Sequence, residues 1–140
     1  MVDECLQLYA AWDQTKRLTL KDETDLAMLD DNKAVHRRSL TSFKDLGLVG
    51  RVVKIKGKIA AYTFGYFLGP ETFCDLLEIA DKKYKGLTAY IFHQLCNDPV
   101  LREVNFINVM DDFALENVNR TKMSFRPSVL IPVYTVNLLR

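Results

Sequence analysis

The spacing of apolar residues changes from helical to alternating at Gly47. Before this glycine, residues 2–16 and then the stretch from near Thr19 to Leu46 place their apolar side chains at helical spacing. Thr19 followed three residues later by Asp22 indicates the start of the second helix. A glycine after the last apolar position ends a helix without steric cost, so Gly47 marks the boundary. The chain therefore opens with two helices.

Beyond Gly47 the apolar residues alternate with period two. Residues 48–67 form two alternating runs around a tight Lys-Gly-Lys turn at 56–58, which is typical of a β-hairpin. Gly65, in the second run, indicates a bulge or a close approach of two backbones. Residues 72–80 predict a third, buried strand that carries two acids, Asp75 and Glu78, although Glu78 could equally face water or pair with a lysine.

The remaining elements alternate between helix and strand. We expect a helix from Gly86 through Cys96, a strand at 104–109, a helix at about 112–121 and a final strand at 129–136, where Pro132 suggests an edge or a bulge. This order predicts an α/β (α+β) fold with a mixed, mostly antiparallel sheet flanked by helices. We expect a single domain over 1–140, with N-terminal helices in 1–46 and the sheet and core helices in 47–140.

Composition limits the classes of function. The 140 residues are 49% hydrophobic and carry 19 basic against 18 acidic side chains, so a net charge of +1 gives no global attraction to nucleic acid or anionic membrane. Three cysteines in no metal-type spacing argue against a disulfide framework and a zinc site, and we expect no metal. No secretory leader and no apolar run of about 18 residues is visible, so we expect a cytoplasmic protein without a transmembrane segment.

Two turns carry the residues from which chemistry is expected. The first follows the strand at 104–109, where Asn108, Asp111 and Asp112 precede a helix that ends in a basic cluster, Lys122, Ser124 and Arg126. An acidic turn followed by a basic cluster can line a cleft. The alternatives are that an aspartate is a plain N-cap, that the cations only compensate the helix dipole, and that Asn108 bonds its own backbone.

The second turn is basic and opens the helix that follows the strand at 72–80. Lysines 82, 83 and 85 precede Gly86, and the start of a helix offers free N–H groups and a positive dipole end to an anion. The alternative is that Gly86 only closes the turn. Because ligands of α/β sheets bind beyond the C-terminal ends of strands, we expect the two turns to share one cleft.

These residues resemble the C-terminal domain of the phosphatidylglycerol lysyltransferase family (DUF2156-like), a relative of the GCN5-type N-acetyltransferase (GNAT) fold. The resemblance rests first on Asn108, Asp112, Lys122, Ser124, Phe125 and Pro127. Further matches are the hairpin turn at 57–61, Glu78, and Tyr84-Lys85-Gly86. The similarity covers most of the chain from about residue 40 onward.

The resemblance implies an acyltransferase that moves an aminoacyl group from a tRNA-type donor to an amine or hydroxyl acceptor, such as a small molecule or a lipid headgroup. It implies cationic stabilisation by Lys122 and Arg126, with Asp112 as a further catalytic residue. Substrate binding falls to Glu78, Asn108, Asp111 and Ser124. The donor phosphate would be held by Lys83, Lys85, Gly86, Leu87 and Thr88, where relatives that use acetyl-CoA bind its pyrophosphate.

Two alternatives stay open. One is an N-acetyltransferase that uses acetyl-CoA as donor, although Thr88 stands where acetyltransferases have a glycine or alanine. The other is a non-catalytic, ligand-binding remnant of the fold. Because lysyltransferases of the family carry a second, preceding domain of the same fold, a homodimer could rebuild the missing half.

Overall fold

The computed structural model describes residues 1–20, 22–112, 115–134, 136 and 138. The chain divides into two compact units, Met1–Asn108 and Val109–Arg140, and each is described by itself below. The organisation as a single domain stays a prediction.

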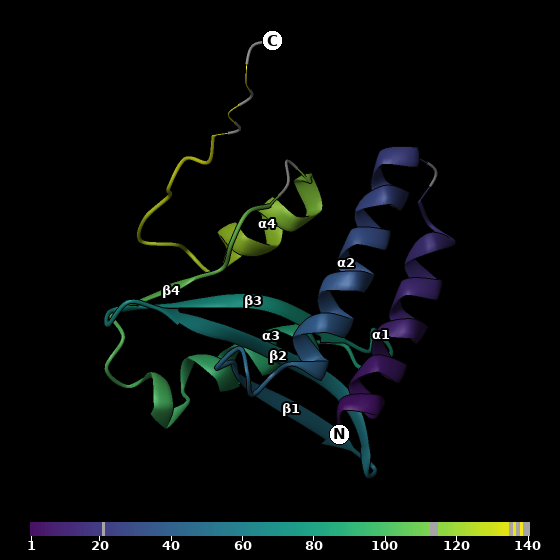
Figure 1. Ribbon diagram of the computed structural model, residues 1–140, viewed down its shortest axis with the longest axis horizontal. Coiled ribbons are helices and arrows are strands. Elements are labelled where there is room, and N and C mark those ends of the chain that lie inside the picture. The colour runs from purple at the N-terminus through teal and green to yellow at the C-terminus, as the bar shows by residue number, and fades with distance from the viewer. Residues whose placement is uncertain (21, 113–114, 135, 137, 139–140) are drawn as a thin grey trace. The chain divides into compact units, whose positions relative to one another are not determined.

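The described residues of the first unit form a four-stranded sheet, three α-helices and one 3-10 helix. Its elements are α1 (Val2–Arg17), α2 (Glu23–Thr41), β1 (Val49–Ile55), β2 (Lys58–Leu68), β3 (Thr72–Ala80), α3 (Leu87–Cys96), the 3-10 helix η1 (Pro99–Leu101) and β4 (Phe106–Asn108). The strand order is β1-β2-β3-β4 (Figure 1). β1, β2 and β3 pair antiparallel, whereas β4 pairs parallel with β3. The predicted class, a mixed and mostly antiparallel sheet flanked by helices, is confirmed.

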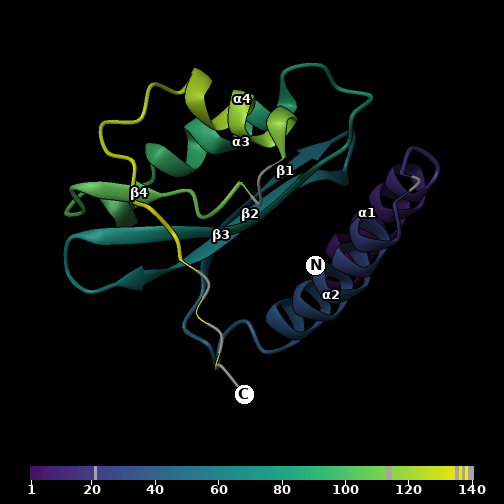
Figure 2. The same cartoon turned by 90° about the horizontal axis from the view of Figure 1, so that it is seen from above.

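Helices cover both faces of this sheet. Figure 2 shows α1 and α2 on one face and α3 on the other. Alternate residues of β2 supply the two cores, as the pleat of a strand requires. Tyr62 and Phe64 pack with Tyr9 of α1 and Leu40 of α2, whereas the small Ala61 packs against α3 at Ile91.

Gly65 lies at a β-bulge, as its place in the sequence suggested. Phe64 pairs with Leu77 of β3, but Gly65 pairs with Asp75, so Leu76 is an extra residue on β3. A Cβ at position 65 would lie 1.8 Å from the carbonyl oxygen of Cys74. Only glycine allows this approach of the two backbones.

Two predicted helix boundaries were wrong. The Thr19 hydroxyl donates a hydrogen bond to the carbonyl oxygen of Lys16 at 2.8 Å, so Thr19 belongs to the turn that follows α1 and does not cap the second helix. α2 begins at Glu23 and ends at Thr41, and the residues up to Gly47 form turns. Gly47 has the left-handed φ of 60° that leads the chain out of these turns into β1.

The second unit contains α4 (Glu116–Ser124), the predicted helix shifted toward the C-terminus. The strand predicted at 129–136 is wrong within the described residues, since 129–134 and 136 form no ladder. Their spacing suits a strand, but a strand also needs a partner for its backbone groups, and the side chains of this run are exposed. None of the helices described in the chain is both long and apolar enough to cross a membrane.

His36 of α2 lies at the centre of the core between the sheet and the first two helices. Its exposed fraction is 3%, its ring centroid lies 4.2 Å from that of Tyr9, and its Nδ1 is 2.8 Å from the Tyr62 hydroxyl oxygen. Burial lowers the pKa of His36 from 6.5 to about 4. The imidazole is therefore neutral at pH 7 and works as a packing group.

This burial predicts a loss of stability in acid. Below pH 6.5 the unfolded chain binds a proton at His36 that the folded chain takes up only near pH 4. The His36 contribution should therefore fall by about 2 kcal/mol between pH 7.5 and pH 5. The measurement is urea unfolding of the protein and of His36→Phe at both pH values, because the difference between them isolates this group. A difference that does not change with pH would contradict the assignment.

Candidate functional site

The bulge places two carboxylates on the same face of β3. Residues three apart in a regular strand point to opposite faces, but the extra residue Leu76 brings Asp75 and Glu78 back to one side. Glu78 lies directly opposite Thr63 of β2, and the Thr63 hydroxyl donates to Asp75 Oδ1 at 2.7 Å. This face is the one that α3 covers, since Ala61, two residues before Thr63, packs there.

The charge of Asp75 opposes the ionisation of Glu78. Burial is the main reason that the pKa of Glu78 rises to about 8, and the negative charge of Asp75 adds to the shift. Glu78 is therefore largely protonated at pH 7, beside a carboxylate that is held by a hydroxyl. Burial, and then the charges of Asp75 and Glu78, also raise the pKa of the Cys96 thiol. Cys96, the last residue of α3, therefore lies near the two acids. A cation brought to this face would favour loss of the Glu78 proton.

Asp75 and Glu78 lie just beyond the point where the pairing of β3 with β4 ends. β4 pairs with β3 only from Thr72 to Cys74, so along 75–80 the second edge of β3 has no strand partner within the described residues. Such an edge offers backbone N–H and C=O groups to an extended ligand, which can bind as an additional strand. Asp75 and Glu78 lie on this open stretch.

A lysine-rich turn follows the same stretch and leads into α3. Its backbone closes on itself, because Tyr84 N–H donates to the Asp81 carbonyl at 3.1 Å and Lys83 N–H donates to Asp81 Oδ1 at 3.0 Å. Gly86 then takes a φ of 81° at the N-cap, a left-handed conformation that suits glycine. No side chain caps this end of the helix, so amides of its first turn can bind an anion.

The predicted donor-binding residues differ in what they can contribute there. The side chains of Lys83, Lys85 and Thr88 are exposed around the turn. The side chain of Leu87 is buried in the core, and its N–H donates to the Tyr84 carbonyl at 3.1 Å. Any phosphate contact would therefore come from the lysines, Thr88 and the next free amides.

Lys16 of α1 belongs near this turn, although nothing in the sequence pattern indicated it. Burial lowers the pKa of its ammonium, and repulsion from Lys82 lowers it further. Its Nζ also lies 5.9 Å from the centre of the Trp12 ring. Two ammonium groups that repel each other form a place where an anion is stabilising.

In the second unit, Lys122 holds a segment of its own backbone. Its ammonium donates to the carbonyl oxygens of Val109, Met110 and Asp111 at 2.5, 3.2 and 2.6 Å. An ammonium has three N–H donors, so these carbonyls can occupy all of them. Met110 has a left-handed φ of 60°, and Lys122 stabilises the bend around it.

The other predicted residues of this unit are largely exposed. Asp112 is half-buried and accepts a hydrogen bond from Asn119 Nδ2 at 2.6 Å. Asp111 is exposed, Ser124 donates to the Thr121 carbonyl at 2.6 Å, and Arg126 follows α4 with a φ of 54°. Asn108 ends β4 in the first unit, opposite Cys74. A single site that combines residues of both units stays a prediction.

The described residues contain no group of three or more His, Cys, Asp or Glu side chains that could hold a metal ion. Of the groups around the carboxylate pair, sequence reasoning named Glu78 as a substrate-binding residue but gave no role to Asp75 or Thr63. The signal that could have found them is Gly65, because a bulge opposite this glycine changes which residues of β3 share a face.

Comparison with known proteins gives the fold but no close relative of established activity. No protein-family model and no curated protein matches the chain. A conserved protein of unknown function from Bacteroides thetaiotaomicron VPI-5482 is 29% identical with a TM-score of 0.78, over 92% of this chain and 42% of that one. This chain therefore spans about two fifths of the length of that protein.

Two further solved structures match over nearly their whole length. A ribosomal-protein-alanine N-acetyltransferase from Brucella melitensis biovar Abortus 2308 is 12% identical with a TM-score of 0.64, covering 98% of this chain and 93% of that chain. A possible acetyltransferase from Clostridium difficile 630 is 14% identical with a TM-score of 0.61, covering 99% and 92%. The chain has the GNAT fold, as the resemblance implied. The more specific resemblance to the lysyltransferase family stays a prediction.

The carboxylate pair predicts an abnormal titration. The side-chain carboxyl carbon of Glu78, followed by ¹³C NMR, should titrate with a midpoint near 8. Asp75→Asn removes the neighbouring charge and keeps the shape, so the midpoint should fall yet stay above 4.5, because burial is the larger cause. A Glu78 midpoint near 4.5 in the unmodified protein would contradict the described geometry.

The three hydrogen bonds of Lys122 predict that its side chain stabilises the backbone at 109–111. Lys122→Met keeps the apolar stem but removes the three donors, so amide hydrogen exchange at 109–112 should accelerate by roughly tenfold or more. Arg120→Met, at an exposed position of the same helix, is the matched control. Unchanged exchange in Lys122→Met would show that these bonds do not hold the segment.

Proposed function

We propose that the chain transfers an aminoacyl group from a phosphate-bearing donor of the tRNA type to an amine or hydroxyl acceptor. The observation that supports this most is the carboxylate pair, Asp75 and Glu78, on the open stretch of β3 that leads into the lysine-rich turn. A bound donor that follows β3 would meet first the acids Asp75 and Glu78 and then the lysine-rich turn. An aminoacyl ester with an ammonium at one end and a phosphate at the other matches this order of charges.

The positive site would hold the phosphate. Uncapped amides in the first turn of α3, together with the side chains of Lys83 and Lys85, favour an anion there. Lys16 adds a cation from α1. Phosphate groups bind at helix starts of this kind in many unrelated folds.

The negative site would hold the ammonium of the transferred amino acid. The Glu78 carboxyl is protonated in the free protein at pH 7, since its pKa is about 8. An ammonium placed between Asp75 and Glu78 would lower this pKa, and Glu78 would lose its proton. A neutral acetyl group could not make this interaction, so the pair discriminates in favour of an aminoacyl group.

The reaction itself needs few protein groups. The acceptor lone pair attacks the ester carbonyl carbon, a new bond to nitrogen or oxygen forms, and the bond to the donor's ribose oxygen breaks. The acceptor's proton passes to that departing oxygen. Binding both partners in line provides a large part of the rate enhancement.

Asn108 at the end of β4 and the residues of the second unit keep the roles predicted for them, with one change. Arg126 and Asp112 are proposed to act on the reacting groups. Asn108, Asp111 and Ser124 are proposed to bind the acceptor, which is a small molecule or a lipid headgroup. Lys122 is proposed to position the backbone at 109–111, because its donors already bond three carbonyls there.

Acetyl transfer from acetyl-CoA is the second candidate. Its support is the likeness of the fold to solved structures named as acetyltransferases, together with the same anion-binding turn. The two candidates differ at the carboxylate pair, which an acetyl donor would leave unused.

The test measures consumption of labelled lysyl-tRNA with phosphatidylglycerol vesicles as acceptor, beside a parallel reaction with acetyl-CoA. Glu78→Gln should lower kcat/KM for aminoacyl transfer by roughly tenfold to a hundredfold, the range for loss of a hydrogen bond to a charged group. Lys83→Ala with Lys85→Ala should raise KM for the donor by roughly threefold to tenfold and leave kcat unchanged.

Lys58→Ala, an exposed lysine in the β1–β2 hairpin, is the matched control for lost surface charge. Glu78→Gln should fold normally, since glutamine resembles the protonated glutamate. Equal turnover by the protein and Glu78→Gln would reject the role of the pair. Turnover with acetyl-CoA alone would favour the second candidate, and binding without turnover of either donor would favour a non-catalytic domain.

A further inference from the structure

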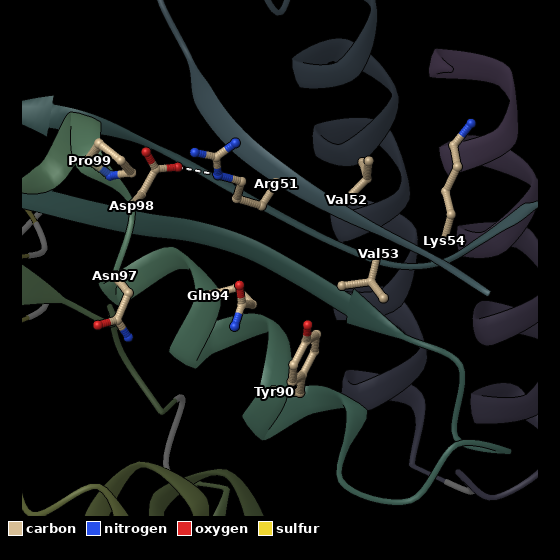
Figure 3. A pocket seen from close by; sticks show the side chains of 9 residues that line it. All are labelled: Arg51, Val52, Val53, Lys54, Tyr90, Gln94, Asn97, Asp98 and Pro99. Atoms are coloured by element: carbon tan, nitrogen blue, oxygen red, sulfur yellow. Dashed lines mark ion pairs between the residues drawn. The ribbon is translucent and has the colours of Figure 1, made fainter.

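A separate pocket of about 410 Å³ lies between β1 and α3. It is on the α3 side of the sheet, but it lies at β1, two strands away from the carboxylate pair on β3. Its lining comes from the middle of β1, from α3 and from the start of η1, and comprises Arg51, Val52, Val53, Lys54, Tyr90, Gln94, Asn97, Asp98 and Pro99 (Figure 3). None of these residues takes part in the proposed acyl transfer.

The side chains that face the pocket are few. Figure 3 shows Val53 on the side of β1 that faces Tyr90 and Gln94 of α3, whereas Val52 and Lys54 leave the strand in the other direction. Val52 and Lys54 therefore line the pocket with main chain. Within the described residues β1 pairs with β2 alone and is an edge strand, so its outer backbone groups add polar atoms here.

Arg51 is held at one end of the pocket by a buried aspartate. The Asp98 side chain is 4% exposed, its Oδ2 pairs with Arg51 Nε, and its Oδ1 accepts the N–H of Val100 at 3.0 Å. Each oxygen of the carboxylate thus has a partner, which fixes the carboxylate, and the carboxylate fixes the guanidinium in turn. The Arg51 side chain itself is 47% exposed, which leaves its outer end open to a ligand.

The fixed guanidinium of Arg51 has N–H groups that the ion pair with Asp98 does not use. Of its N–H groups, Nε serves Asp98, and within the described part of the chain no second carboxylate pairs with Arg51. A guanidinium presents its outer N–H groups as a planar fork that matches the two oxygens of a carboxylate. Val53 and the Tyr90 ring provide apolar contact, and the Gln94 amide can donate a further hydrogen bond.

We propose that this pocket binds a small organic monocarboxylate through the outer N–H groups of Arg51, with its apolar part against Val53 and Tyr90. Because Asp98 already neutralises Arg51, it would repel a phosphate dianion more strongly than a monoanion, which favours the monocarboxylate. The volume lies in the range of small-molecule pockets. The site is independent of the proposed acyl transfer.

The test is an NMR titration of the full chain with benzoate, a planar monocarboxylate with an apolar ring. Saturable shifts are expected at the Arg51 Nε–H, the Gln94 side-chain amide and the backbone amides of 51–54. Arg51→Lys keeps the charge but loses the fork, so the affinity should fall roughly tenfold or more. Gln94→Ala, on the exposed side of α3, should weaken binding severalfold without altering the fold.

Arg102→Lys, an exposed arginine just after η1, is the matched control and should leave benzoate binding unchanged. Gln94→Ala also keeps the test valid if Arg51→Lys loosens the Asp98 pair. Shifts that stay linear up to about 50 mM benzoate would overturn the proposal, as would inorganic phosphate bound equally well at the same resonances.

Discussion

The register of the sheet depends on the contact between Gly65 and the backbone of Cys74. Any side chain at position 65 would collide with the Cys74 carbonyl, because an ideal Cβ lies only 1.8 Å from its oxygen. The close approach admits Leu76 as an extra residue of β3, and the extra residue turns Asp75 and Glu78 to one face. Burial is the main cause of the raised pKa of Glu78, and the bulge adds the second cause, the charge of Asp75 on the same face. Any cation bound at this face would depend on the same contact.

Much of the first unit could be predicted from local pattern alone. The hairpin, the strand at 72–80 and the helix that follows Gly86 depend on spacing within a few residues, and their predicted bounds agree with the structure. Gly65 was read as a bulge or a close approach, and it is both. These features are local because a turn or a pleat is decided by its own residues.

The failures have a common physical cause, which is that a local signal has more than one way to be satisfied. Thr19 had the chemistry of an N-cap, yet its hydroxyl bonds back to Lys16. Residues 129–134 alternate like a strand, but a strand also requires a partner edge. The sequence could not predict that Asp75 and Glu78 share a face, because the bulge at Leu76 depends on how β2 and β3 pair. The catalytic role of Lys122 stays a prediction, and in the structure its ammonium donates to three backbone carbonyls.

Proton release on ligand binding shows whether Asp75 and Glu78 bind an ammonium group. The ligand is the lysyl amide of 3′-amino-3′-deoxyadenosine, a stable analogue of the end of an aminoacyl-tRNA. Calorimetry at pH 7 in two buffers of different ionisation enthalpy should show close to one proton released, because Glu78 ionises when the ammonium binds, and Glu78→Gln should abolish the release. Binding without proton release, or equal release from Glu78→Gln, would show that Glu78 does not ionise to bind the ammonium.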